Sequence, residues 1–555
     1  MPAITTFNAL LTFLALGTRI RADAPNYTDL TSYQAGALGE APTQSFFSSS
    51  LKAPIYQVNK FDADKVDDTG YIFLTGGYDG YGPSIISSKD LSLVYADQSY
   101  SFSQAASTGT LYGEQVLVVY AGDAVRIFNK HYELLYAVRP QGDLRGWYAD
   151  SHEAYLSPDD TVVLVIGRRE PVDLQAIGYG TEEVTNIIIQ EVDPRSNAVL
   201  FEFNLLDYFS PEDSFWPKNG TGPYHFDDTW DPWHVNAVQK TAAGDFLVSS
   251  RHLHSVFLVD GATAQVKWVM GGKRSDFADV STDASAVFRW QHNAQFTADN
   301  RIMLFDNQAV FNDYCTGEEM AWNCSRGLEI QFDTESWTYW VADEWYHPQA
   351  LVSASRGGVN RTPRGNTLVA WGQNPMYTEH DADGAVVMDI QRGRVLALDH
   401  GISSVVAYRA WKSDWVGLPK WPPSIAVNDT DNGTNIYVSW NGATEVETYV
   451  LLTSDSIATL NGMTAVTAES KRMGFETSFP MSANRTFARI AALDSNGTIL
   501  GYTEAIDTRT HKTIDPGYPI DGISSLKTAN TSTTSTLSFS AFACVALILV
   551  VGCTA

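Results

Sequence analysis

Short apolar runs separated by polar turns fill most of the chain between residues 60 and 410. Residues 71–75, 91–95 and 115–120 are rich in β-branched and aromatic side chains, a composition that is typical of strands. Gly, Asn and Asp separate these runs, as tight turns require. No part of this region keeps a helical period beyond a turn or two, so the pattern predicts an all-β protein.

One pattern recurs within this region: a polar start, an alternating run, a turn, and a second run that ends in polar side chains. It occupies residues 151–168, 233–252, 291–307 and 357–373, with turns at Asp159-Asp160, Ala243-Gly244, Asp299-Asn300 and Arg364-Gly365. Spacings of roughly 60 to 80 residues suit one propeller blade plus insertions, and about six blades would fill the region. A parallel β-helix would show shorter and stricter repeats.

Partners in an antiparallel hairpin lie symmetrically about the turn, so counting outward from each turn predicts which residues face one another. The counting predicts three pairs: His234 with Arg251, His292 with Asn307, and His152 with Arg168. If these hairpins are the inner strands of successive blades, the six residues lie on one rim and point toward the central channel.

The predicted architecture is a six-bladed β-propeller followed by a small fibronectin- or immunoglobulin-like β-sandwich. Residues 411–421, WKSDWVGLPKW, mark the junction between them. The expected boundaries are 1–24 for a signal peptide, 25–420 for the propeller, 421–512 for the sandwich, 513–530 for a Ser/Thr-rich stalk, and 531–555 for a cleaved tail.

Both ends of the chain carry targeting patterns. Residues 9–16 form a short apolar core before Ala22-Asp23-Ala24, which suits a signal-peptidase site. An apolar run from 539 to 551 follows a polar spacer and predicts a GPI-attachment signal that is cleaved near Asn530; a tail-anchored transmembrane helix is the alternative. We therefore expect a secreted protein held at the cell surface by a lipid anchor. Glycosylation sequons agree with this and lie at Asn26, Asn219, Asn323, Asn360, Asn428, Asn432, Asn484, Asn496 and Asn530.

Charge and cysteine content narrow the partners further. The formal net charge of −27 disfavours nucleic acid, which requires clustered Lys and Arg. With the tail removed, Cys315 and Cys324 are the cysteines that remain, and an oxidising compartment favours a disulfide between them.

A rim that carries His and Arg residues suits an anionic substrate, because the cations stabilise charge that moves between donor and acceptor. A neutral imidazole can act there as a general base or as a covalent nucleophile. The alternative is that such histidines are structural and bonded to a neighbouring blade. His252 and His254 lack a third ligand, so no metal is expected, and Asp381-Ala382-Asp383-Gly384 is interpreted as a hairpin turn. Asp343 and Glu344 near His347 leave an acid/base pair for glycoside hydrolysis open.

Several short motifs occur in order: DPWHVNAV at 231–238, SSRH at 249–252, KWVMGG at 267–272, QHNAQ at 291–295, FDN at 305–307 and GNTLVAWG at 365–372. Together they resemble the arylsulfotransferase family, in the branch found in fungal secreted proteins. The resemblance covers roughly residues 60 to 410.

The resemblance implies a nucleotide-independent aryl sulfotransferase that needs no cofactor. Sulfate would pass from a phenolic ester to a second phenol through a histidine. The residues expected in catalysis are His234, His252, His292 and Arg326, and those expected in substrate binding are Arg251, Arg356 and Asn307. His292 is the first candidate nucleophile, before His252 and His347. The family arginine that follows FDN is displaced, which makes Arg326 its first candidate, with Arg356 or Arg361 as substitutes. The alternative is a non-catalytic cell-surface propeller that binds aryl, anionic or cell-wall ligands.

Overall fold

The computed structural model describes residues 23–75, 82–218, 229–282, 285–308, 324–395, 405–481, 484–517 and 519–520. The expected signal peptide up to residue 22, Asn219, Asn323, Cys315 and the region from 521 onward, with Asn530 and the apolar tail, lie outside these residues. Cys324 is disulfide-bonded. Within the described ranges no helix is long and apolar enough to cross a bilayer.

The fold is all-β, as predicted, and most strands belong to six antiparallel sheets of four or five strands. In chain order the first three sheets are β28 (Ala410–Ser413), β4 (Tyr71–Leu74), β5 (Ser84–Ser87) and β6 (Leu93–Ala96); β7 (Ser103–Leu111), β8 (Glu114–Ala121), β9 (Ala124–Phe128) and β10 (Leu134–Val138); and β11 (Tyr155–Leu156), β12 (Val162–Asp173), β13 (Thr181–Val192) and β14 (Val199–Asn204).

The next three sheets are β15 (Val235–Lys240), β16 (Phe246–Ser250), β17 (Ser255–Val259) and β18 (Val266–Gly271); β20 (His292–Ala298), β21 (Arg301–Asp306), β22 (Arg326–Asp333) and β23 (Thr338–Tyr346), with β19 (Ala278–Asp279) added in parallel; and β24 (Gly358–Arg361), β25 (Thr367–Ala370), β26 (Met376–His380), β27 (Val386–Gln391) and β3 (Gln57–Phe61).

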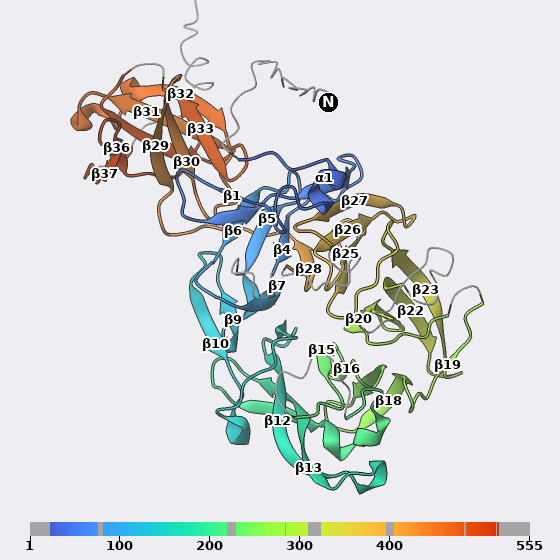
Figure 1. Ribbon diagram of the computed structural model, residues 1–555. Helices are drawn as coiled ribbons and strands as arrows, with labels where there is room; N and C mark the ends of the chain where they lie inside the picture. Colours follow the sequence, from blue (N-terminus) through green and yellow to red (C-terminus); the bar gives the residue numbers. More distant parts are fainter. Residues whose placement is uncertain are drawn as a thin grey trace, which may run out of the picture.

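Successive sheets pack face to face around a common centre, and their colours run in order around a ring in Figure 1. The apolar cores lie between neighbouring sheets; Val165 and Phe257, from β12 and β17, share one such core. Residues at or beside β7, β11, β15, β20, β24 and β28 line one cavity of about 250 Å³. Six sheets that present their first strands to one central cavity have the arrangement of a β-propeller.

Two strand pairings, each between an early and a late part of the sequence, close the ring. The late strand β28 pairs with β4, so the innermost strand of that sheet comes from the C-terminal side. The early strand β3 pairs with β27 and forms the outer edge of the sheet that contains β24 to β27. Lys412 on β28 is fully buried and forms an ion pair with Glu379 at 2.6 Å. Closure therefore joins residues that lie more than 300 positions apart in sequence, as Gln391 and Gln57 do.

Two further sheets follow the ring and share a core that includes Trp440, Tyr449 and Ile490. They contain β29 (Ser424–Thr430), β30 (Gly433–Ser439) and β33 (Glu476–Pro480) in one sheet, and β31 (Thr448–Ser454), β32 (Val466–Lys471), β34 (Phe487–Leu493), β35 (Ile499–Tyr502), β36 (Ala505–Asp507) and β37 (Lys512–Ile514) in the other. The other helix and strands are α1 (Leu30–Gln34), β1 (Thr43–Ser45) and β2 (Lys52–Pro54), beside several short 3-10 helices. The Tyr132 hydroxyl donates to the Gly442 carbonyl at 2.8 Å and joins this region to the ring.

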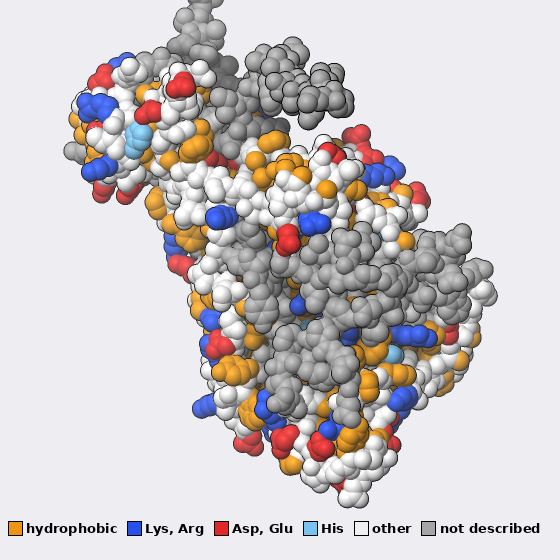
Figure 2. Space-filling model, viewed as in Figure 1, with side chains coloured by type: hydrophobic (Ala, Val, Ile, Leu, Met, Phe, Trp, Pro, Cys, Tyr) orange, Lys and Arg blue, Asp and Glu red, His pale blue; other side chains and the backbone are white. Residues whose placement is uncertain are grey.

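The sequon at Asn360 is a wrong prediction. Its side chain is 3% exposed on β24, and Nδ2 donates to the Ala410 carbonyl at 2.6 Å, so a glycan has no room there. The turn predicted at Asp381–Gly384 does connect β26 and β27, and the Asp381 amide donates to Ala385 at 2.9 Å. On the face shown in Figure 2, acidic and basic side chains of the described residues are interspersed.

Candidate functional site

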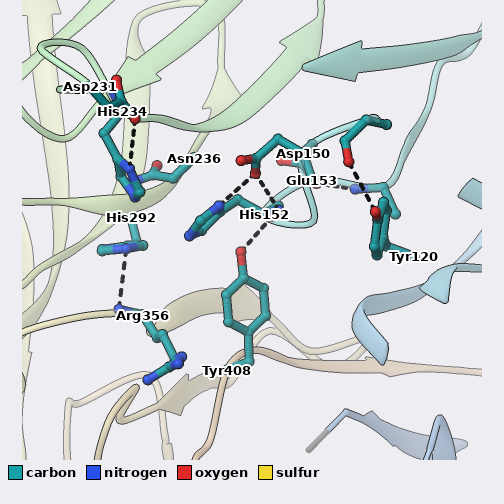
Figure 3. Close-up of polar contacts among 12 residues, drawn as sticks. Tyr120, Asp150, His152, Glu153, Asp231, His234, Asn236, His292, Arg356 and Tyr408 are labelled. Atoms are coloured by element: carbon teal, nitrogen blue, oxygen red, sulfur yellow. Dashed lines mark hydrogen bonds and ion pairs between the residues drawn. The ribbon is translucent and has the colours of Figure 1, made fainter. Parts of the chain in front are cut away.

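A cluster of histidines occupies the end of the central channel where the first strands begin. His152 precedes β11, His234 immediately precedes β15, and His292 is the first residue of β20. The rings of His152 and His234 lie 4.7 Å apart between centroids and meet edge to face, and His252 lies 4.9 Å from His234. Figure 3 shows His152, His234 and His292 turned toward a shared centre. The hairpins thus bring the three histidines that were expected in catalysis, His234, His252 and His292, together with His152.

Asp231 holds His234 in one orientation and one tautomer. Its Oδ1 accepts the His234 backbone N–H at 2.8 Å, and its Oδ2 lies 3.1 Å from Nδ1. Nδ1 therefore carries the proton and Nε2 keeps a lone pair, which forms no hydrogen bond with any residue the structure describes. Burial lowers the pKa of His234, which keeps the imidazole neutral at pH 7. His234 is thus an oriented base or nucleophile with about a quarter of its side chain exposed.

Asp150 and His152 repeat this arrangement one sheet earlier. Asp150 Oδ1 accepts the His152 backbone N–H at 2.7 Å and lies 2.5 Å from Nδ1. Burial opposes ionisation of Asp150, but the charge and hydrogen bond of His152 outweigh it and lower the Asp150 pKa. The Tyr408 hydroxyl donates to the His152 carbonyl at 2.6 Å and fixes the segment from the closing side of the ring.

His252 and His292 have both ring nitrogens engaged. In His252, Nδ1 donates to the Asp231 carbonyl at 2.7 Å and Nε2 accepts from Arg251 at 2.9 Å. In His292, Nδ1 donates to Asn307 Oδ1 at 2.7 Å and Nε2 accepts the Arg356 backbone N–H at 3.2 Å. Burial holds the pKa of both imidazoles well below the usual value. In both rings the Nε2 lone pair already accepts a hydrogen bond, which disfavours His292 as the nucleophile, and Asn307 orients His292.

The three candidate arginines differ in what they contact. Arg251 bonds His252 and the Ala354 carbonyl, 2.9 Å away, inside the cluster. Arg356 reaches the cluster through its backbone, and among the described residues its guanidinium has no hydrogen bond or ion pair. Arg326 is elsewhere: Nε bonds Asp306 at 3.0 Å and Nη1 bonds Glu344 at 2.8 Å. Arg326 is 1% exposed and structural, which makes its assignment to catalysis wrong.

Other predicted residues also lie away from the cluster. Arg168 lies on β12 and forms an ion pair with Glu170, so the predicted pairing with His152 is wrong. His347 is buried against Trp371, with its ring centroid 5.1 Å from the indole centroid. The glycosidase pair is unsupported as well: Glu344 bonds Arg326, and Asp343 lies 3.7 Å from Arg361, which also bonds Glu329.

Aromatic side chains form one wall of the site beside His252. Trp216 stacks on His252 at 5.3 Å with 13° between the planes, and Trp290 meets the same ring edge on at 6.0 Å. Phe215 stacks on His254 at 4.1 Å, and burial lowers the pKa of His254 to about 3. The wall supplies a flat apolar surface that suits an aromatic ring.

The residues that sequence reasoning missed are Asp150, Asp231 and the aromatic wall, while His152 was placed on the rim without a role. The signal was present as Asp-Ser-His at 150–152 and Asp-Pro-Trp-His at 231–234. A carboxylate two or three residues before a histidine can accept its backbone N–H and its Nδ1–H together, as both aspartates do.

Solved structures that are similar to this chain share little sequence with it. A protein of unknown function from Bacteroides caccae is 11% identical over 62% of this chain and 98% of its own, with a TM-score of 0.36. The Cps50 (Swd1) β-propeller domain from Myceliophteria thermophila is 10% identical over 64% and 90%, with a TM-score of 0.32. The Dos1 propeller is 11% identical over 70% and 82%, with a TM-score of 0.26.

No curated protein matches the chain. A family match does exist. It begins within β7, runs through β23 and β27, and includes every histidine of the cluster. Residues 108–393, more than half of the chain, match the arylsulfotransferase (ASST) family, and the protein belongs to that family.

Proposed function

We propose that this protein transfers sulfate from a phenolic sulfate ester to a phenolic acceptor, with His234 as the group that carries the sulfuryl moiety. The observation that carries the proposal is the Nε2 lone pair of a neutral imidazole whose Nδ1–H is held by Asp231. In His252 and His292, which share the cluster, the Nε2 lone pair already accepts a hydrogen bond. We also propose that the six sheets are the six blades of a propeller over residues 25–420, before a fibronectin-like sandwich over 421–512.

The first step forms a bond between His234 Nε2 and sulfur while the bond from sulfur to the aryl oxygen breaks, and the phenolate leaves with the electron pair. The imidazolium that forms is stabilised by Asp231, which accepts its remaining N–H. In the second step an acceptor phenol oxygen attacks sulfur, and the pair in the S–N bond returns to Nε2. Both steps place negative charge near Arg251 and Arg356, which stabilise it.

The test is release of 4-nitrophenol from 4-nitrophenyl sulfate by the purified protein, with and without a second phenol. The expected result is acceptor-dependent turnover, and a gain of one sulfuryl group on the His234 peptide when the acceptor is left out. His234→Ala should lose both, whereas His511→Ala, on the outer surface of the sandwich, should keep both. Turnover by His234→Ala at the wild-type rate would refute the assignment. Binding of phenyl sulfate without any release would instead support the non-catalytic alternative.

A further inference from the structure

Two histidines, each paired with an aspartate, face each other at the centre of the ring. His152 and His234 lie edge to face at 4.7 Å, and each has its Nδ1–H on the aspartate that precedes it. The Nε2 atoms of both are unbonded within the part of the chain that the structure describes. Each side chain keeps about a quarter of its surface exposed, so a substrate can reach both.

The proposed reaction requires one proton that His234 cannot supply. While His234 Nε2 is bonded to sulfur and Nδ1 stays on Asp231, a weakly acidic phenol must take a proton from another group as it leaves. In the second step the acceptor phenol must give a proton up. One group that donates first and accepts second satisfies both needs.

We propose that His152 is this general acid and base, a catalytic role that rests on the proposed transfer through His234. In the first step the Nε2–H of a protonated His152 is donated to the departing aryl oxygen. In the second step the same Nε2 takes the proton of the acceptor hydroxyl as its oxygen attacks sulfur. The reaction then balances: the donor phenol leaves with the proton that the acceptor phenol later returns.

The contacts of His152 support this role, and the contacts of the neighbouring residues exclude them as the general acid and base. Asp150 lies 2.5 Å from Nδ1 and stabilises the protonated ring. The hydroxyl of Tyr408 already donates its proton to the His152 carbonyl. Glu153 is held by Arg409 at 2.9 Å and accepts the Val238 amide, so its carboxylate is committed to the channel wall. His252 and His292 have no ring nitrogen left.

The leaving group separates a general acid from a structural residue. A weakly acidic phenol needs protonation as it departs, whereas 4-nitrophenolate leaves readily without it. The experiment measures sulfation of His234 and phenol release for His152→Gln with two donors, phenyl sulfate and 4-nitrophenyl sulfate. Asp150→Asn serves as a second variant that keeps the imidazole, and His511→Gln is the matched control.

We expect His152→Gln to slow phenyl sulfate cleavage by about 10²- to 10⁴-fold, which is the usual contribution of a general acid to the rate. Cleavage of 4-nitrophenyl sulfate should slow by less than about 10-fold. Asp150→Asn should also slow the cleavage of phenyl sulfate more than that of 4-nitrophenyl sulfate, with a smaller decrease for each donor than in His152→Gln. Equal losses for both donors in both variants would overturn the role of His152. Absence of His234 sulfation in the wild type would instead overturn the proposed transfer, so the two failures are distinguishable.

Discussion

Replacing Arg326 by Met is expected to weaken the fold of the ring rather than to remove a catalytic group. The side chain is 1% exposed and its partner Asp306 is 0% exposed, with 3.0 Å between Nε and Oδ2. Removing one member of a buried ion pair costs roughly 3 to 5 kcal/mol, because the other charge stays buried without compensation. Asp306 keeps two other donors, the Arg289 backbone N–H at 3.0 Å and Gln308 Nε2 at 2.6 Å. We therefore expect the lower end of the range, about 3 kcal/mol.

Urea unfolding followed by tryptophan fluorescence measures this loss. With a slope of about 3 kcal/mol per molar urea, the midpoint for Arg326→Met should fall by about 1 M. The matched control is Arg356→Met: its guanidinium has no ion pair among the described residues, so its midpoint should stay within about 0.2 M of the wild type. Activity should show the opposite order, with the larger loss in Arg356→Met. An unchanged midpoint for Arg326→Met, together with lost turnover, would refute this reasoning.

Three further predictions follow from the cluster. Because burial lowers the pKa of His234, kcat/KM for 4-nitrophenyl sulfate, whose leaving group needs no proton from His152, should stay level as pH falls to 6.5 and decline only below it; a decline that begins above pH 7 would contradict this. His254 has a folded pKa of about 3, so its contribution to the free energy of unfolding is complete above pH 6.5 and is lost as pH falls. Between pH 7 and pH 5 the free energy of unfolding, measured by urea titration, should therefore fall by about 2 kcal/mol less for His254→Phe than for the wild type. Trp216→Ala removes the ring stacked on His252 and should raise KM for aryl sulfates several-fold with kcat little changed, whereas an unchanged KM would exclude the wall from aryl binding.

Counting outward from the turns predicted contacts in two of the three hairpins, although bulges shift the register in both. Around Ala243-Gly244 the Arg251 amide donates to the His234 carbonyl at 3.0 Å, because a bulge between Val235 and Ala237 shifts the pairing there. The count for His292 is displaced, because bulges in β20 place it opposite Phe305; its side chain still reaches Asn307. It fails for His152 because β11 contains only two residues and the chain bends before it. Bulges and bends depend on packing between sheets, which one hairpin does not encode.

The roles of individual residues were harder to predict than their positions. Which ring nitrogen stays unbonded depends on contacts from other sheets, such as the Arg356 amide on His292 across 64 positions of sequence. The burial of Arg326 likewise follows from Asp306 on the neighbouring strand β21. The order of the strands, by contrast, follows from local turns and apolar periodicity. The sequence therefore indicated the sheets and the histidine rim, and left the assignment of proton and charge to the packed structure.

The strand that closes the ring is also the last strand of the ring to be synthesised. Tyr408 and Arg409, just before β28, bond His152 and Glu153 across 256 positions of sequence. A nascent chain that has already made all four cluster histidines still lacks these contacts until residue 410 has left the ribosome. Contacts between such distant positions form slowly. The Asp150–His152 pair therefore lacks the support of Tyr408 in every nascent chain from which residue 408 has not yet emerged, so the complete arrangement forms late in synthesis.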